Sequence, residues 1–93
     1  KKGKYGTVRD LEGNPVEGAS VALREAEFDK VVIKRVTDEN GRYRILANKG
    51  RYYIEVLEPS FKVESIQGDT EILVEKDDQW ITSEIVVSRI EKG

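Results

Sequence analysis

The sequence predicts an all-β fold: an antiparallel Greek-key β-sandwich of about seven strands, formed by a single domain of 93 residues. Apolar and polar residues alternate along most of the chain, which is the pattern of strands with one buried face. Clusters of Gly, Pro, Asn and Asp interrupt the alternation at intervals of roughly ten residues, as the turns of a sandwich do. No window shows the 3.6-residue period of an amphipathic helix.

The alternation defines the expected strands in chain order. In the first strand Gly6 and Val8 share a face, and in the second Ala19, Val21 and Leu23 point to one side. The start of the third strand is apolar on both faces, which is typical of a strand covered on both sides or of an interface. The expected strands cover residues 5–9, 19–24, 31–36, 43–45, 51–56, 61–66, 72–74 and 80–90.

The connections carry residues that suit tight turns. In the loop of residues 10–18, Gly13 suits a positive φ and Pro15 stiffens the exit. The strongest turn signal is Asp38-Glu39-Asn40-Gly41, because Asn-Gly tolerates the positive φ angles of a tight hairpin. Pro59 is expected to end the fifth strand, since proline cannot donate to a strand ladder.

The inward positions predict a shared core of Val21, Ile45, Ile54 and Val56. The long last strand leaves its register open, because apolar residues fall on both of its faces. Ile81, Ile85 and Val87 lie on one of these faces, and Trp80, Val86 and Ile90 lie on the other.

The order and spacing of the turn residues resemble the carboxypeptidase regulatory-like domain, a transthyretin-like (prealbumin-like) sandwich. The resemblance covers about residues 4–63. Its motifs are Gly6-x-Val8-x-Asp10, Gly13-x-Pro15-Val16-x-Gly18-Ala19-x-Val21, Thr37-Asp38-x-x-Gly41-x-Tyr43 and Gly50-x-Tyr52.

The resemblance implies a non-catalytic accessory or scaffold module. In that family the module sits beside catalytic domains, in outer-membrane transporters and in strings of surface or secreted domains. We therefore expect an extracytoplasmic protein (cell surface, periplasmic or secreted), with neighbouring domains of the same chain or another protein as partners. Because the sequence starts at Lys1 and contains no methionine, we also expect the domain to be excised from a larger protein.

A related sandwich, the collagen-adhesin B-type repeat, offers a second comparison, since some of its members form an internal Lys–Asn or Lys–Asp isopeptide bond beside a buried acid. Glu55 is similar in position to that acid, but the alternation places it on the face opposite Tyr52 and Ile54. The last expected strand contains no Asn or Asp to accept the bond. The residues therefore argue against such a crosslink.

Composition excludes several function classes. The chain contains no histidine and no cysteine, which removes the commonest general base, the usual nucleophile pairs and most zinc sites. The formal net charge of −2 argues against a dominant role in binding nucleic acid or an anionic membrane surface. No apolar run is long enough to span a membrane. We expect no catalytic residues and no cofactor.

One loop carries the best metal candidates. Asp10, Glu12 and Asn14 place oxygen atoms at alternate positions, with Glu17 nearby, and calcium prefers six to eight oxygen ligands in such loops. The loop lacks the full EF-hand pattern, and Pro15 restricts its backbone. An ordinary polar loop is therefore the favoured interpretation, and no metal is expected.

Two stretches are candidates for a docking surface, because both are apolar on two faces. The candidate residues are Val31, Val32, Ile33, Trp80, Val86 and Ile90. The alternative function is carbohydrate binding by exposed aromatic rings, with Trp80, Tyr53 and Phe28 as candidates.

Overall fold

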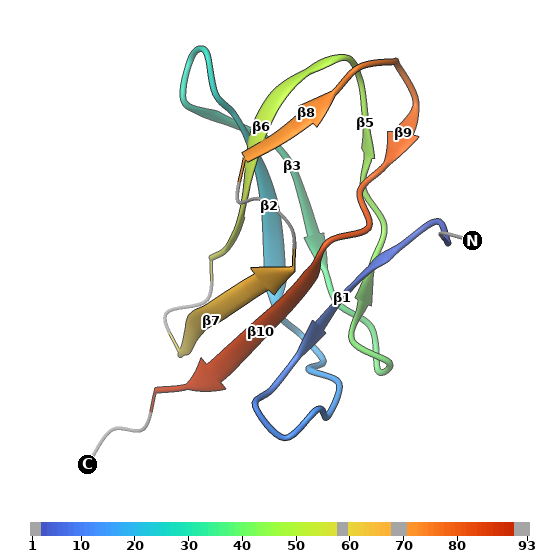
Figure 1. Ribbon diagram of the computed structural model, residues 1–93. Coiled ribbons are helices and arrows are strands. Elements are labelled where there is room, and N and C mark those ends of the chain that lie inside the picture. Colours follow the sequence, from blue (N-terminus) through green and yellow to red (C-terminus); the bar gives the residue numbers. More distant parts are fainter. Residues whose placement is uncertain (1–2, 58–59, 68–70, 91–93) are drawn as a thin grey trace.

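The computed structural model describes residues 3–57, 60–67 and 71–90 (Figure 1). Two four-stranded sheets and one two-stranded sheet make up the regular structure of these residues. Within the described residues there is no helix capable of crossing a membrane. The strands are β1 Gly6–Arg9, β2 Ser20–Glu25, β3 Lys30–Val36, β4 Arg42–Tyr43, β5 Leu46–Ala47, β6 Gly50–Val56, β7 Phe61–Gln67, β8 Glu71–Val74, β9 Gln79–Trp80 and β10 Glu84–Arg89.

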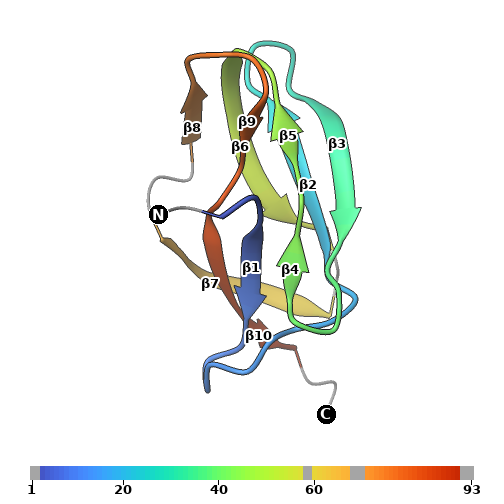
Figure 2. The same cartoon turned by 90° about the vertical axis from the view of Figure 1, so that its right-hand side faces the viewer.

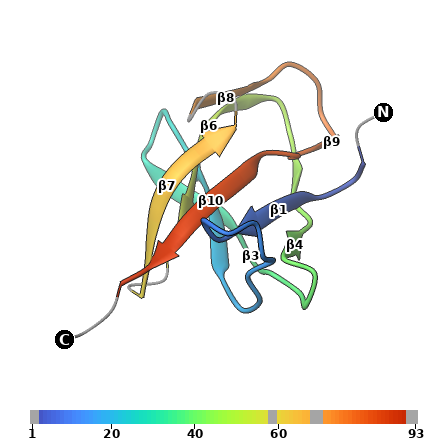
Figure 3. The ribbon, with the colours of Figure 1, turned by 60° about the horizontal axis from the view of Figure 1, so that its bottom comes forward.

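The two larger sheets have the strand orders β4-β1-β10-β7 and β3-β2-β6-β8. In the second sheet β3 and β8 are the two edges, and Figure 2 shows them at opposite sides of the molecule. The expected all-β sandwich is confirmed. One pair departs from a wholly antiparallel arrangement, because β1 and β10 run parallel, with arrowheads pointing the same way in Figure 3. Such a pair needs no hairpin, since its strands lie far apart in the sequence.

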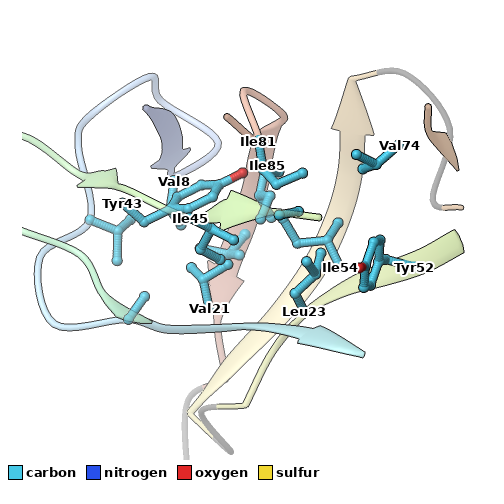
Figure 4. Packing of buried hydrophobic residues seen from close by; sticks show 14 residues of the cluster. Val8, Val21, Leu23, Tyr43, Ile45, Tyr52, Ile54, Val74, Ile81 and Ile85 are labelled. Atoms are coloured by element: carbon cyan, nitrogen blue, oxygen red, sulfur yellow. The ribbon is translucent and has the colours of Figure 1, made fainter. Parts of the chain in front are cut away.

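The core fills the space between the two larger sheets (Figure 4). The expected core residues Val21, Ile45 and Ile54 are buried, and Val56 packs against them at the end of β6. Burying an aliphatic side chain of this size contributes about 1.5–3 kcal/mol, so these residues dominate the stability of the sandwich. The buried cluster comprises Val8, Val16, Ala19, Val21, Leu23, Tyr43, Ile45, Ala47, Tyr52, Ile54, Val74, Ile81, Ile85 and Val87.

Tyr43 joins three strands of the first sheet. Its ring lies over Gly6 on β1, where a Cβ atom would overlap the ring. Its hydroxyl donates a hydrogen bond of 2.8 Å to the carbonyl of Ser83, just before β10. Burial raises the pKa of Tyr43, because the phenolate would lose its hydration. The glycine at position 6 is thus a packing requirement of the tyrosine.

Thr37 anchors the end of β3 to the start of β2. It is buried, and its hydroxyl donates to the carbonyl of Val16 at 2.7 Å while accepting from the amide of Ala19 at 2.9 Å. The backbone amide of Thr37 also donates to the carbonyl of Ala19. These bonds satisfy buried polar groups where the chain leaves the second sheet.

The predicted tight turn at Gly41 is present, and the amide of Asp38 donates across it to the carbonyl of Arg42 at 3.0 Å, but the flanking strands do not continue as a hairpin. The amide of Gly41 donates to the carbonyl of Asp38 at 2.9 Å, which closes the turn. The strands on either side, β3 and β4, lie in different sheets and do not pair. The reason is that the Gly41 carbonyl accepts from the amide of Val8 at 2.7 Å, so the chain moves onto β1 as soon as it turns. Gly41 has a positive φ and Asn40 does not.

The stretch 80–90, expected as one strand, is divided between two sheets. Trp80 pairs with Leu46 in the small β5-β9 sheet, and β10 begins four residues later in the first sheet. The chain crosses at Thr82 and Ser83, and the Ser83 carbonyl accepts hydrogen bonds from the amide of Thr7 on β1 and the hydroxyl of Tyr43 on β4. The open register is now resolved, because Ile81, Ile85 and Val87 are the buried residues. The predicted end of the fifth strand at Pro59 lies outside the described residues.

Candidate functional site

The outer face of the sheet β3-β2-β6-β8 carries exposed apolar side chains. Tyr53 points outward because Tyr52 and Ile54 on the same strand are buried. Leu57 and Val36 also point outward, since both lie beside Ser20 at the start of β2, where the next residue, Val21, points into the core. Leu73 extends this set onto β8 and is 66% exposed. We call Val36, Tyr53, Leu57 and Leu73 the outer-face patch.

Two ion pairs lie among the residues of the outer-face patch. Arg24 binds the Glu55 carboxylate through Nε at 2.8 Å and Nη2 at 2.7 Å. Arg51 approaches Glu71 at 2.8 Å across β6 and β8. Glu55 thus points outward, as the alternation predicted, and pairs with a cation. Since both pairs are partly exposed, they add at most about 1 kcal/mol each and mainly hold the side chains flat against the sheet.

A groove opens at the edge of the same sheet. It has a volume of about 1020 Å³ and lies between β8, the segment 79–84 and residues 3–7. Trp80 and Tyr5 contribute aromatic surface to it. Three carboxylates also line it, those of Glu71, Glu75 and Glu84, together with one cation, Lys76. With three carboxylates against one cation, the charged side chains of the groove have a net negative charge.

The Thr7 hydroxyl is the unusual polar atom of this groove. Thr7 lies on β1, between Arg42 on β4 and Glu84 on β10. Its Oγ1 is buried and has no hydrogen-bond partner among the described residues. Buried polar atoms in folded proteins nearly always have a partner, which is often a water molecule or a ligand.

The calcium candidates have a structural role within their own loop. The Asp10 carboxylate accepts hydrogen bonds from the backbone amides of Asn14 at 2.8 Å and Glu12 at 3.0 Å. The hydrogen bond from the backbone amide of Asn14 is the main reason that the pKa of the Asp10 carboxyl is lowered. Across the described residues, no group of three or more acidic, His or Cys side chains is placed to hold a metal ion.

The structure places the predicted docking residues on separate elements. Val32 is exposed on β3, whereas Val31 is half-buried and Ile33 is half-buried against the core. Trp80 lies on β9, in the small sheet. Val86 is half-buried on β10 in the opposite sheet, and Ile90 is exposed just beyond it. These six residues therefore do not form one continuous surface.

The predicted carbohydrate-binding aromatics are also separated. Phe28 is exposed in the turn between β2 and β3, and Tyr53 lies on the outer face of β6. Trp80 is 38% exposed and lines the groove. No flat strip joins these three rings.

Sequence reasoning missed most of the outer-face patch. The signal was the same alternation that identified the core: if Val56 and Val74 point inward, their neighbours Leu57 and Leu73 must point outward. Runs that are apolar on both faces drew attention to Val31 and Ile33 instead. The groove depends on how distant segments pack, so no local pattern indicates it.

Comparison with known proteins identifies the family. A search of curated proteins gave no match. The family model described as the carboxypeptidase regulatory-like domain matches residues 5–80, which is most of the chain. This family consists of non-catalytic β-sandwich modules, in agreement with the two sheets and with the core between them. The chain belongs to the carboxypeptidase regulatory-like domain family.

Proposed function

We propose that this chain is an accessory or scaffold module of a larger protein, and that it packs against a neighbouring domain or a partner protein through the outer-face patch. The observation that carries the proposal is the exposure of Val36, Tyr53, Leu57 and Leu73 on one side of one sheet. Four large apolar side chains gathered on one sheet face typically mark a protein contact.

The composition of this face supports a protein partner. Protein interfaces combine apolar and aromatic groups with arginine, and their charged groups are paired. Here Tyr53 and Leu73 lie beside Arg51, which is paired with Glu71, while Leu57 and Val36 flank the Arg24–Glu55 pair. A partner would therefore meet paired charges at Arg24, Glu55, Arg51 and Glu71, and among the described residues of this face would need an acceptor only for Lys34, the exposed cation beside Val36.

The proposed context is extracytoplasmic, at the cell surface, in the periplasm or in a secreted protein. This part rests on the family, whose members occur in surface and secreted proteins and in outer-membrane transporters. A non-catalytic sandwich in such a protein acts as a spacer or as a docking surface.

The test is a pair of substitutions, Leu57→Asp with Leu73→Asp, made in the isolated domain and in the full-length protein. In the isolated domain both side chains face solvent, so the free energy of unfolding should change by no more than about 0.5 kcal/mol per site. In the full-length protein they should destabilise the packed assembly by about 2 kcal/mol or more, because a carboxylate would be buried at the contact.

The matched control is Leu11→Asp, since Leu11 is comparably exposed but lies in the loop after β1. This substitution should leave the free energy of unfolding in urea unchanged, both in the isolated domain and in the full-length protein. If the double variant behaves like this control in the full-length protein, the outer-face patch is not a packing surface.

Carbohydrate binding is the second candidate, and the placement of Trp80 in the groove favours it. Rings at the edge of a polar groove are a common way to hold a sugar. Carbohydrate binding is tested directly by adding soluble glycans to the protein and following the fluorescence of Trp80, the single tryptophan. A saturable change in emission would support this candidate.

A further inference from the structure

The groove beside β8 is suited to a cationic, donor-rich occupant. Ionised carboxylates accept hydrogen bonds and donate none, so Glu75 and Glu84, which outnumber the single cation Lys76, supply acceptors to an occupant, while Glu71 is already paired with Arg51. No ion pair to Glu75 or Glu84 is present among the described residues. Lysine and arginine side chains carry donors only and would satisfy these groups.

The groove also runs along a free strand edge. β8 pairs with β6 on one side, and it is the last strand of its sheet on the other. An edge strand presents unpaired backbone N–H and C=O groups, which an extended segment satisfies by adding a strand. The occupant is therefore expected to be an extended segment rather than a helix.

The opposite edge of the same sheet has the complementary charge. β3 is seven residues long and contains Lys30, Lys34 and Arg35 with no acidic residue. All three cations are exposed, as are the apolar Val32 and Val36. Exposed lysines on an edge strand prevent pairing with a second copy of the same edge, but not with an acidic one.

We propose that β3 of one copy of this chain docks against the free edge of β8 of the next copy, in the acidic groove. The direction of the strands fits this junction. β3 is antiparallel to β2, β2 to β6 and β6 to β8, so β3 and β8 have opposite directions. If the next copy is related to the first by translation without rotation, its β8 therefore runs antiparallel to β3 of the first copy.

Such an assembly is a head-to-tail row rather than a closed dimer. The interface uses two different edges of each copy, so it is heterologous and leaves one free edge at each end. The contact is small, because β8 contains only four residues. Association should be weak, reversible and sensitive to salt, which screens the charges that select the partner. This inference concerns strand edges and goes beyond the proposed packing of the outer-face patch.

The experiment is analytical ultracentrifugation of the domain at low salt, from about 10 μM to about 1 mM, with two charge-reversal variants. The first reverses β3, by Lys34→Glu and Arg35→Glu. The second reverses the groove, by Glu75→Lys and Glu84→Lys. All four side chains are exposed, so the variants should fold, which circular dichroism checks. The wild type should associate with rising concentration, and each variant should associate at least about tenfold more weakly.

Mixing the two variants gives the decisive result. A reversed β3 edge fits a reversed groove, and the unaltered edges of the two variants also fit each other, so an equimolar mixture should associate like the wild type. The control variant, Lys49→Glu with Lys62→Glu, changes the net charge as the β3 reversal does, at exposed sites elsewhere. It should associate normally.

Three outcomes overturn the proposal: a wild type that stays monomeric at low salt, reversal variants that associate like the wild type, or a mixture that does not recover. A glycan that changes Trp80 emission without any self-association would assign the groove to sugar instead. The outer-face patch shares Val36 and Leu73 with these two edge strands, but its own test replaces Leu57 and Leu73 and leaves the charged residues of both edges unchanged.

Discussion

Replacing Gly41 by alanine separates two physical effects at one position. Gly41 has a φ of +72°, a conformation that costs an L-residue with a side chain about 1–2 kcal/mol. A Cβ atom there would also lie 2.5 Å from the carbonyl oxygen of Val8 and 3.0 Å from both Pro15 Cβ and Val16 N. Two of these neighbours are backbone atoms and the third belongs to a proline ring, so none can rotate away.

The magnitude follows from adding these effects. Relieving the overlap requires the turn to move away from β1, which weakens the hydrogen bond of 2.7 Å from the Val8 amide to the Gly41 carbonyl. Overpacking of this kind typically costs about 1–3 kcal/mol. With the backbone strain, Gly41→Ala should destabilise the domain by about 2–5 kcal/mol. Urea unfolding followed by the fluorescence of Trp80 measures this difference.

Gly13→Ala is the matched control. Gly13 has a φ of +88° but nothing within 4 Å of the position of a Cβ atom, so only the backbone strain applies. The control should cost about 1–2 kcal/mol. If Gly41→Ala costs no more than Gly13→Ala, the close approach of the turn to β1 is refuted, although both glycines would still require a positive φ.

Three further predictions concern the core and its polar contacts. Thr37→Val should cost about 1–3 kcal/mol in urea unfolding, because it leaves two buried backbone groups unpaired, whereas Thr37→Ser should retain most of the stability. Ile54→Ala should cost about 2–4 kcal/mol, and a loss below about 0.5 kcal/mol would show that Ile54 is not in the core. Burial raises the pKa of Tyr43, so the unfolded chain loses this proton first and stability should fall as pH rises above about 10. In Tyr43→Phe this part of the pH dependence should disappear, and an unchanged alkaline profile would contradict the assigned burial.

The alternation of residues predicted the fold because it reports directly which side chains a strand buries. Leu23 and Ile54 were placed inward and Tyr53 outward on this basis, and the structure agrees. The pattern failed where a strand changes sheets. The alternation of residues 80–90 continues through Thr82, yet the backbone leaves β9 and begins β10 there, because it bonds to β1 through Ser83.

Turn chemistry was informative about backbone angles and not about strand partners. Asn40-Gly41 correctly indicated a tight turn with a positive φ at Gly41. It did not reveal that the next strand pairs with β1, since that depends on the hydrogen bond from the amide of Val8, distant in the sequence, to the carbonyl of Gly41. The candidate sites depend even more on such contacts. The groove brings residues 3–7 against β8 and the segment 79–84, and only the folded chain shows this.

The central claim is that the outer-face patch packs against neighbouring protein, and the exposure of its methyl groups tests this most directly. The measurement is paramagnetic relaxation of leucine methyl signals by a soluble probe, in the isolated domain and in the full-length protein. Leu57 and Leu73 should relax strongly in the isolated domain and become protected in the full-length protein, while Leu11 stays exposed in both. Equal relaxation of Leu57 and Leu73 in the two forms would contradict the account.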